Sequence, residues 1–401
     1  MMNQVAAFQK ELDNILSYWM IFTPDLNNGG FYGKIDHKNN VDPEAPKGSV
    51  LNARILWTFS AAYQQNPKPA LLNMAKRAYQ YIRKYFIDPQ YGGVYWTVDY
   101  QGKPLDTKKQ IYALSFTIYG LTEYYRVSGD EAALELAQQL FLDIEKYSFD
   151  LEKGGYLEAF TRDWQELPDL RLSAKDANEK KTMNTHLHVL EAYTNLYRVW
   201  KDEFLEKQIR AVIGNFLDHM IDRQNNRLIL FFDENWQPKS TTVSYGHDIE
   251  TSWLLLEAVH VLNDEKLAAQ VSQLAISMAR AAADGLAQDG SLYYEYEPEA
   301  DHLVKERHWW VQAEALVGFL NAWQLSGEQI FLDHFENVWQ FIQHKIKSDE
   351  GEWVWGINDD DTLMPNEDKV GLWKCPYHNS RAMLELIQRF KENHLGLGKF
   401  I

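Results

Sequence analysis

A short motif of glycine and aromatic residues recurs six times along this chain of 401 residues, and it narrows the choice of fold at once. Successive copies begin about 60–70 residues apart, as expected for an architecture built from repeats. The copies are GGFYG (Gly29–Gly33), GGVYW (Gly92–Trp96), GGYLE (Gly154–Glu158), NRLILFF (Asn226–Phe232), GSLYYEY (Gly290–Tyr296) and GEWVWGI (Gly351–Ile357). Each copy predicts a tight turn that leads into a short strand.

Two stretches with the apolar period of an amphipathic helix separate successive copies of the motif. In the first unit these stretches are Leu51–Tyr63 and Ala70–Phe86. Asp130, Asp264 and Ser326 stand near expected helix starts, where a short polar side chain can cap free backbone N–H groups. Each unit therefore predicts a pair of helices.

Six units of two helices predict twelve helices in all. The first helix, near Val5–Phe22, and the last, near Tyr377–Lys391, each lack a partner within their own unit. Pairing these two closes a ring. We therefore predict an all-α fold, an (α/α)6 barrel with short β-hairpin or strand-like connections at one face, as a single catalytic domain over residues 1–401. The alternative is an open solenoid of helix pairs, but six units are enough to close a ring.

Composition excludes several classes of protein. The chain has 40 Lys and Arg against 57 Asp and Glu, a net charge of −17, which argues against binding nucleic acid or an anionic membrane surface. Its one cysteine, Cys375, rules out a disulfide framework and a multi-cysteine metal site. There is no apolar run of about 20 residues to span a membrane. We see no signal peptide at Met1–Phe8, so a cytoplasmic protein is expected.

Unusual polar and aromatic residues stand near the start of the first helix of each pair. They are Asn52 and Arg54; Tyr112; Asn184, His186 and His188; His247, Asp248 and Glu250; His308, Trp309, Trp310 and Glu314; and Trp373, Tyr377, His378 and Arg381. In a barrel with parallel inner helices these starts meet at one mouth, so they predict a pocket there. Helix N-termini at such a mouth favour developing negative charge. His186 and His188 lie about 200° apart around a helix, so only one can face the pocket and the other is expected to be structural.

Some of these residues allow a second interpretation. Arg54 lies in an apolar stretch, where a buried guanidinium needs either an ion pair, for example with Glu250, or a ligand oxygen. Trp310 and Trp373 could be core residues. The chain has no HExxH motif, and the run Asp359–Asp361 indicates a solvated loop rather than a calcium site.

A pocket of histidines with arginine and tryptophan suits proton transfer at carbon in a neutral, polyhydroxylated substrate. Imidazole can act as base or acid near neutral pH, and a guanidinium can stabilise the enediolate formed beside an aldehyde. Two histidines on opposite faces of one carbon allow epimerisation, whereas one histidine serving adjacent carbons gives aldose–ketose isomerisation. Glycoside hydrolysis would need two carboxyl groups, for which Glu250, Glu314 and Asp248 are the candidates. A non-catalytic carbohydrate-binding protein would not need converging histidines.

Six segments that contain these residues resemble the N-acylglucosamine 2-epimerase superfamily, and within it the cellobiose 2-epimerases most closely. The segments are Gly29–Asp36, Lys47–Tyr63, Lys181–Arg198, Ser244–Leu255, Trp309–Ala322 and Trp373–Glu385. The resemblance implies an (α/α)6 barrel that catalyses reversible C2 epimerisation of the reducing-end glucose in β-1,4-linked disaccharides. Cellobiose would become glucosyl-mannose, and lactose would become epilactose. No metal or organic cofactor is implied.

The resemblance also implies roles for nine residues. The catalytic set would be His188, His247 and His378, with His247 and His378 as the two acid/base groups at C2 and His378 also helping to open the pyranose ring. The substrate-binding set would be Arg54, Tyr112, Asn184, Glu250, Trp310 and Trp373. In that set Arg54 would bind the O1 and O2 region, Glu250 would orient His247, and Trp373 would stack on the second sugar ring.

One departure from the resemblance lies next to Tyr112. Many members of the superfamily have Gln-Ala-Phe where this chain has Leu114-Ser115-Phe116. This change could alter the pocket floor or only repack the core. The superfamily also includes mannose 2-epimerases and mannose isomerases with matching histidines, so these activities remain alternatives.

Overall fold

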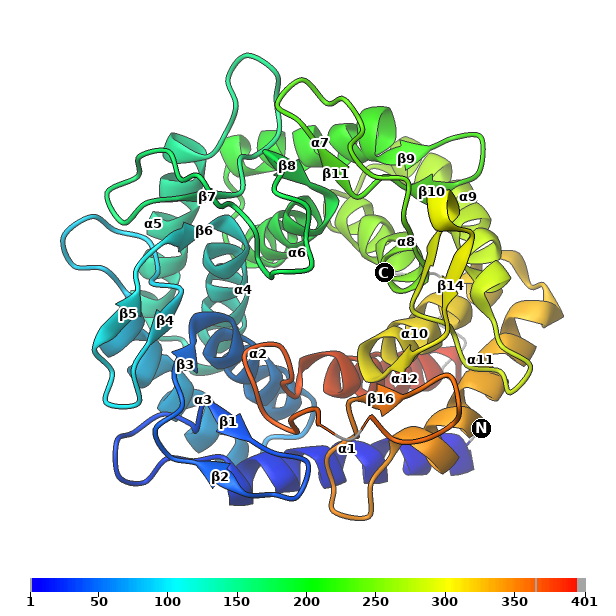
Figure 1. Ribbon diagram of the computed structural model, residues 1–401, viewed down its shortest axis with the longest axis horizontal. Helices are drawn as coiled ribbons and strands as arrows, with labels where there is room; N and C mark the ends of the chain where they lie inside the picture. The colour runs from blue at the N-terminus through cyan, green and yellow to red at the C-terminus, as the bar shows by residue number, and fades with distance from the viewer. Residues whose placement is uncertain (1, 365, 395–401) are drawn as a thin grey trace.

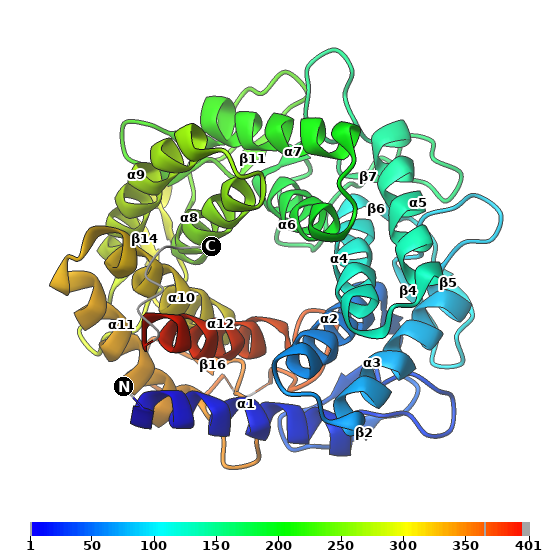
Figure 2. The ribbon, with the colours of Figure 1, turned by 180° about the vertical axis from the view of Figure 1, so that it is seen from behind.

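The computed structural model describes residues 2–364 and 366–394, and in this part of the chain twelve α-helices form two concentric rings (Figures 1 and 2). The inner ring contains α2 (Ser49–Gln65), α4 (Ile111–Ser128), α6 (Met183–Val199), α8 (Tyr245–Val261), α10 (Trp309–Ser326) and α12 (Tyr377–His394). The outer ring contains α1 (Met2–Phe22), α3 (Pro69–Tyr81), α5 (Glu131–Tyr147), α7 (Glu203–Asn215), α9 (Glu265–Ala282) and α11 (Gln329–Phe341). The predicted (α/α)6 barrel is confirmed. The expectation of one domain over residues 1–401 also covers residues 1, 365 and 395–401, which lie outside the described part.

The ring closes through the first and last helices. Each inner helix packs against two inner neighbours and at least one outer helix, and α12 contacts both α10 and α2. Helix α1 packs on α12, as Figure 2 shows for the blue and red helices. The predicted pairing of these two helices is therefore confirmed, and the open solenoid is wrong.

Sixteen short strands, each of two or three residues, join the helices. They are β1 (Lys34–Ile35), β2 (Val41–Asp42), β3 (Lys47–Gly48), β4 (Thr97–Val98), β5 (Pro104–Asp106), β6 (Lys109–Gln110), β7 (Ala159–Phe160), β8 (Lys181–Thr182), β9 (Ile221–Asp222), β10 (Arg227–Leu228), β11 (Phe231–Phe232), β12 (Val243–Ser244), β13 (Glu295–Glu297), β14 (His302–Val304), β15 (Arg307–His308) and β16 (Gly356–Ile357). They form small antiparallel sheets of two or three strands.

These strands link successive units around the ring. The strand directly before each of five inner helices pairs with the strand that follows, or ends, the glycine and aromatic motif of the next unit: β3 with β4, β6 with β7, β8 with β11, β12 with β13, and β15 with β16. A bridge between Ile35 and Val370 makes the sixth link, just before α12. The motif therefore fixes the starts of the inner helices at one mouth of the barrel.

Buried ion pairs reinforce four of these junctions. In each, a lysine near the start of an inner helix reaches an acidic residue beside a glycine turn. The pairs are Lys47–Asp25 at 2.7 Å, Lys109–Asp88 at 2.9 Å, Lys181–Asp150 at 2.8 Å and Lys374–Glu352 at 2.6 Å. Removing one partner of such a pair leaves a buried charge uncompensated, which typically costs about 3–5 kcal/mol.

His186 supports the third motif rather than the pocket. Its Nε2 accepts a hydrogen bond from the backbone N–H of Tyr156 at 2.9 Å, and its Nδ1 donates to the carbonyl of Thr182 at 2.7 Å. Gly155 has a φ of +77°, and a Cβ there would lie 2.8 Å from Nε2 of His186, so only glycine fits both the turn and the contact. The prediction that one of the two neighbouring histidines is structural is confirmed.

The three predicted helix caps fared differently. The carboxylates of Asp130 and Asp264 accept from backbone N–H groups of Ala132 and Leu267, as predicted. The prediction for Ser326 is confirmed in part. Its hydroxyl accepts from the backbone N–H of Glu328, the residue directly before α11, at 3.1 Å. Ser326 is, however, the last residue of α10, and its hydroxyl also donates to the carbonyl of Ala322, four residues earlier in that helix.

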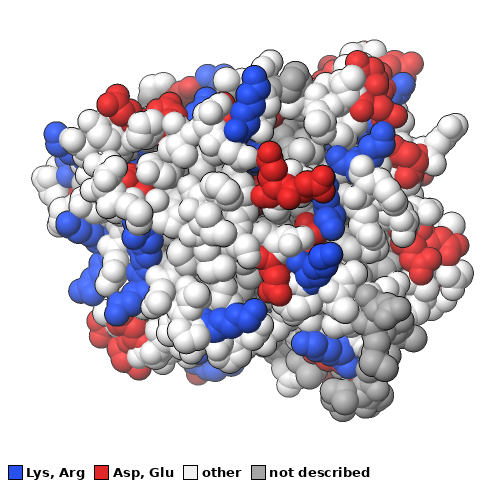
Figure 3. Space-filling model, turned by 90° about the horizontal axis from the view of Figure 1, so that it is seen from below, with Lys and Arg blue, Asp and Glu red and all other residues white. Residues whose placement is uncertain are grey.

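Side chains of both charges occur together on the face of the barrel drawn in Figure 3. None of the described helices combines the length and the apolar character that crossing a lipid bilayer requires.

Candidate active site

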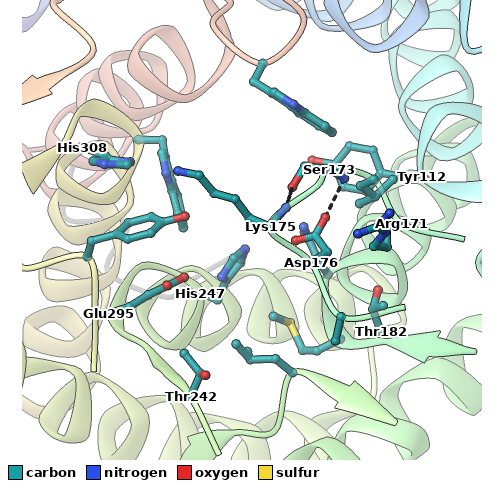
Figure 4. A pocket seen from close by; sticks show the side chains of 18 of the residues that line it. Tyr112, Arg171, Ser173, Lys175, Asp176, Thr182, Thr242, His247, Glu295 and His308 are labelled. Atoms are coloured by element: carbon teal, nitrogen blue, oxygen red, sulfur yellow. Dashed lines mark hydrogen bonds between the residues drawn. The ribbon is translucent and has the colours of Figure 1, made fainter. Parts of the chain in front are cut away.

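A pocket of about 750 Å³ opens at the mouth where the inner helices begin (Figure 4). It is lined by all nine residues for which the resemblance implies a role: Arg54, Tyr112, Asn184, His188, His247, Glu250, Trp310, Trp373 and His378. Eight of these residues come from the six inner helices, and Trp373 comes from the segment just before α12. Of the other residues listed at the helix starts, His308 and Trp309 also line the pocket, whereas Asn52, His186, Asp248, Glu314, Tyr377 and Arg381 do not. The volume lies in the range of small-molecule sites.

Four histidines line the pocket, and of the three predicted to be catalytic, two each pair with a buried glutamate. Nδ1 of His188 lies 3.0 Å from Oε2 of Glu191, and Nδ1 of His378 lies 2.7 Å from Oε1 of Glu314. A carboxylate can only accept, so each neutral ring carries its proton on Nδ1 and has its lone pair on Nε2. This arrangement suits a base that acts through Nε2.

The third histidine has a neutral partner. Nδ1 of His247 lies 2.8 Å from the hydroxyl oxygen of Ser244. The expectation that Glu250 orients His247 is therefore wrong, because Oε1 of Glu250 accepts from Nη2 of Arg381 at 2.7 Å. Spacing along the helix suggested the contact, but the glutamate turns toward the stronger charged donor.

Arg381 connects the carboxylates beneath the pocket. Its Nη2 donates to Glu250 and Glu314, each at 2.7 Å, and its Nη1 donates to Glu191 and to the hydroxyl of Tyr377. His188 and His378 are thus linked through their glutamates to one guanidinium. This single positive charge faces three buried carboxyl groups.

Because one guanidinium serves three carboxyl groups, their pKa values differ. Burial raises the pKa of Glu191, but the charge of Arg381 and the contacts with His188 and Tyr377 together outweigh it and hold that pKa at about 2. Burial and the neighbouring charge of Glu314 raise the pKa of Glu250 to about 8. Glu250 is therefore protonated at neutral pH and can donate a hydrogen bond into the pocket.

The environment keeps the three imidazoles neutral. Burial lowers the pKa of each ring. The pKa of His247 falls to about 3, through burial and the nearby His188. For His378, the charges of Arg54 and Arg381 add to the effect of burial. Neutral rings of this kind can accept a proton from a substrate.

Arg54 carries a buried positive charge into the pocket wall. Its Nη2 donates to the hydroxyl of Tyr112 at 2.7 Å, and its guanidinium lies 4.1 Å from the ring centroid of Phe116. No carboxylate in the described part of the chain forms a salt bridge with it, so the suggested pair with Glu250 is wrong. Its Nε and the amide oxygen of Asn184 are buried atoms without a protein partner. Both fit the oxygens and hydroxyls of a sugar.

Two tryptophans provide aromatic walls. The Trp310 ring lies 4.9 Å from His247 and 5.8 Å from His378 between ring centroids, so it stands next to both imidazoles. Trp373 lies 5.9 Å from Tyr112 and is only partly buried. Both indoles line the pocket, so the alternative that they are purely core residues is wrong.

The departure next to Tyr112 belongs to the core. Leu114 and Ser115 are fully buried, and the hydroxyl of Ser115 donates to the carbonyl of Ile111. The ring centroid of Phe116 lies 4.5 Å from that of His188, and the guanidinium of Arg54 lies over the Phe116 ring, which is itself not part of the pocket wall.

The acidic residues do not form a hydrolase pair. Glu250 and Glu314 bind the same nitrogen of Arg381, so a guanidinium and not a glycosidic bond lies between them. Asp248 accepts from Nη1 of Arg227 at 3.0 Å and is not part of the pocket wall.

The same residues also bear on metal binding. Ligand atoms of Glu250, Glu314 and His378 lie within 4.8 Å of one another. Arg381 already places its positive charge against both carboxylates, and a divalent cation there would meet it at close range. The expectation that the protein uses no metal or cofactor stays a prediction.

The structure adds pocket residues that the sequence analysis missed. A loop between β7 and β8 lines the mouth with Leu170–Ala177, and Figure 4 shows Lys175 extending from it toward the side of His308. Tyr294, Glu295 and Glu306 line the opposite side. The loop has no periodic pattern, so nothing in the sequence marked it as part of the site.

Two further residues had a signal that could have found them. Glu191 follows His188 by three residues, and Ser244 precedes His247 by three, which is one helical turn in each case.

Comparison with known proteins identifies the class. A family model described as N-acylglucosamine 2-epimerase matches residues 30–382. The chain belongs to this family.

Within the family, the chain is similar to proteins named cellobiose 2-epimerase. One from Bacteroides fragilis is 51% identical over 381 residues, covering 94% of this chain and 97% of that protein. One from Ruminococcus albus is 41% identical, covering 96% of this chain and 98% of that protein. The solved structure of the cellobiose 2-epimerase from Bacillus thermoamylovorans aligns with a TM-score of 0.92 at 42% identity, covering 97% of this chain and all of that one.

Proposed function

We propose that this protein is a carbohydrate epimerase that reversibly inverts C2 of the reducing-end glucose in β-1,4-linked disaccharides such as cellobiose and lactose. The observation that carries the proposal is three neutral imidazoles around one pocket beside a guanidinium that has no carboxylate partner. Relatives of this chain at 38–51% identity that bear the name cellobiose 2-epimerase support the choice of substrate.

The reaction begins with the sugar ring opening to an aldehyde, because only then is the C2 proton acidic. His378 assists this step at the ring oxygen. One of His247 and His378 then removes the proton from C2 through its Nε2, and a cis-enediolate forms. The other histidine returns a proton to the opposite face of C2, which gives the epimer.

Negative charge develops on O1 and O2 of the enediolate. Arg54 stabilises it with the guanidinium donors that face the pocket, while Tyr112 and Phe116 hold that group in place. His188 assists the proton transfer, and Asn184 bonds a sugar hydroxyl. Glu250, protonated at neutral pH, donates a further hydrogen bond without adding a negative charge.

Trp373 is expected to bind the second sugar ring at the mouth. Trp373→Ala should lower kcat/KM for cellobiose by about tenfold, because a sugar–indole contact is worth roughly 1–1.5 kcal/mol. The matched measurement uses free mannose or glucose, for which the loss should be small. An equal loss on both sugars would place Trp373 outside the second-ring subsite.

The lowered pKa values of the imidazoles predict the acid limb of the pH profile. A base with a lowered pKa stays unprotonated to lower pH, so kcat/KM should hold its full value well below pH 6.5. On the alkaline side, ionisation of Glu250 near pH 8 adds a negative charge beside the enediolate, so activity should fall there. Glu250→Gln should remove that alkaline fall. An acid limb with its midpoint above pH 6.5 would contradict the assignment.

Product analysis tests the proposed reaction. Purified protein is incubated with cellobiose, lactose and mannose, and the products are separated by anion-exchange chromatography against authentic standards. Glucosyl-mannose from cellobiose is the expected product. A ketose would indicate an isomerase, glucose would indicate a hydrolase, and turnover of mannose alone would indicate a monosaccharide enzyme.

A further inference from the structure

Ser244 stands where a serine normally caps a helix, but its hydroxyl does not cap. It is the residue directly before α8, and its side chain accepts no hydrogen bond from the N–H groups of the first turn. Thr182 stands at the same place before α6, and its hydroxyl accepts from the N–H of Thr185. A capping contact typically stabilises a helix by about 1 kcal/mol, and Ser244 does not provide this stabilisation to α8.

The hydroxyl of Ser244 contacts His247 instead. It lies 2.8 Å from Nδ1 of that ring, and the side chain of Ser244 is 1% exposed. Trp310 packs against the same imidazole at a tilt of 51°, and it can do so because residue 246 is glycine: a Cβ there would lie 2.5 Å from the indole. The ring is therefore held by Ser244 at Nδ1 and by contact with Trp310, and Nε2 is the nitrogen left for a substrate.

The three histidines with a proposed catalytic role differ in the partner of Nδ1. A carboxylate fixes the proton of His188 and of His378 on Nδ1, whereas a hydroxyl can either donate to Nδ1 or accept from it. The neutral His247 ring can therefore adopt either tautomer: Nε2 carries a lone pair when Nδ1 holds the proton, and Nε2 carries the proton when Nδ1 accepts from Ser244.

We propose that Ser244 is a positioning residue for the epimerisation, whose rotatable hydroxyl holds the His247 ring and lets it serve as base in one direction and as acid in the other. This inference rests on the proposed function. Other titratable groups around His247 are the ring of His188 on α6, Glu314 on α10, and Glu295, which pairs with Ser244 across β12 and β13.

The test compares three variants at residue 244 with the wild-type enzyme on cellobiose and on its epimer. Ser244→Ala should lower kcat about 10–100-fold in both directions with KM changed less than about threefold, because the ring loses its hold and the substrate contacts remain. Ser244→Thr keeps a hydroxyl and should recover most of the activity. The thermal midpoint of Ser244→Ala should stay close to that of the wild type, because no cap is lost.

Ser244→Asp gives a readout that a purely structural role would not move. A carboxylate on Nδ1 stabilises the protonated ring, so the acid limb of kcat/KM should move to higher pH. The same shift should appear in an NMR titration of the His247 Cε1–H signal, which does not depend on activity. Circular dichroism checks that each variant is folded. If Ser244→Asp does not fold, the kinetics of Ser244→Ala decide the test.

The outcomes separate the two claims. Wild-type protein that leaves cellobiose unchanged would overturn the proposed function. Wild-type protein that epimerises cellobiose, together with Ser244→Ala at full kcat, would overturn the role of Ser244 alone. An unshifted His247 titration in a folded Ser244→Asp variant would also overturn it.

Discussion

Replacing either His247 or His378 with alanine should reduce kcat for cellobiose epimerisation by about 10²–10⁴-fold, the usual contribution of a general acid/base. Each ring supplies one of the two proton transfers in the proposed reaction. Steady-state rates from product analysis, with circular dichroism to verify folding, measure this loss. Turnover above about one tenth of the wild-type rate in a folded variant would contradict the assigned role.

The single variants also allow a more selective readout. A variant that keeps only one of His247 and His378 should still exchange the C2 hydrogen of one epimer with D₂O, but it should not form the other epimer. His247→Ala and His378→Ala should therefore label opposite epimers. His334→Ala on the outer helix α11 is the matched control, because that ring lies outside the pocket and should not affect exchange.

Arg381→Met should destabilise the protein by about 3–5 kcal/mol at pH 8, because it leaves three buried carboxyl groups without a positive partner. The carboxyl groups then have pKa values above those of the unfolded chain. Their penalty disappears as they are protonated, so the loss of stability should be smaller at pH 5. Urea unfolding at both pH values measures the difference. We expect activity to be lost as well, since His188 and His378 depend on the same carboxylates.

Arg389→Met provides the control on the same helix. Arg389 pairs with Glu385 and donates to Asn321 and Gln324 in a partly exposed position, so its removal should cost about 1–2 kcal/mol, less than that of Arg381, with little difference between the two pH values. Equal destabilisation of the two variants, or no pH dependence for Arg381→Met, would contradict the role of Arg381 as the shared counter-charge.

The ring could be predicted from sequence because its repeat is visible there. The glycine and aromatic motif marks each junction, and the unpartnered helices α1 and α12 complete the count. The start of each inner helix carries unusual polar residues in the sequence, and the resemblance to a known family selects nine of them, all of which line the pocket. The closure of the ring could be predicted because six helix pairs are enough to complete it, and the pairs can be counted along the sequence.

The contacts within the site could not be predicted in the same way. Glu250 stands one turn after His247, yet it turns to Arg381, because a charged donor from a distant helix outweighs a local neighbour. Arg54 meets Tyr112 and Phe116 rather than a carboxylate, which depends on side-chain directions that the spacing does not set. The loop Leu170–Ala177 reaches the pocket only through the three-dimensional fold.

The central claim is that this protein inverts C2 by moving a proton between histidines and carbon. Proton NMR of cellobiose with the purified enzyme in D₂O tests it most directly. We expect a mannose-type reducing end to appear and deuterium to enter at C2 in the product. A mannose-type product that keeps the original C2 proton would contradict proton exchange with the histidines, and unchanged cellobiose would contradict the proposed activity itself.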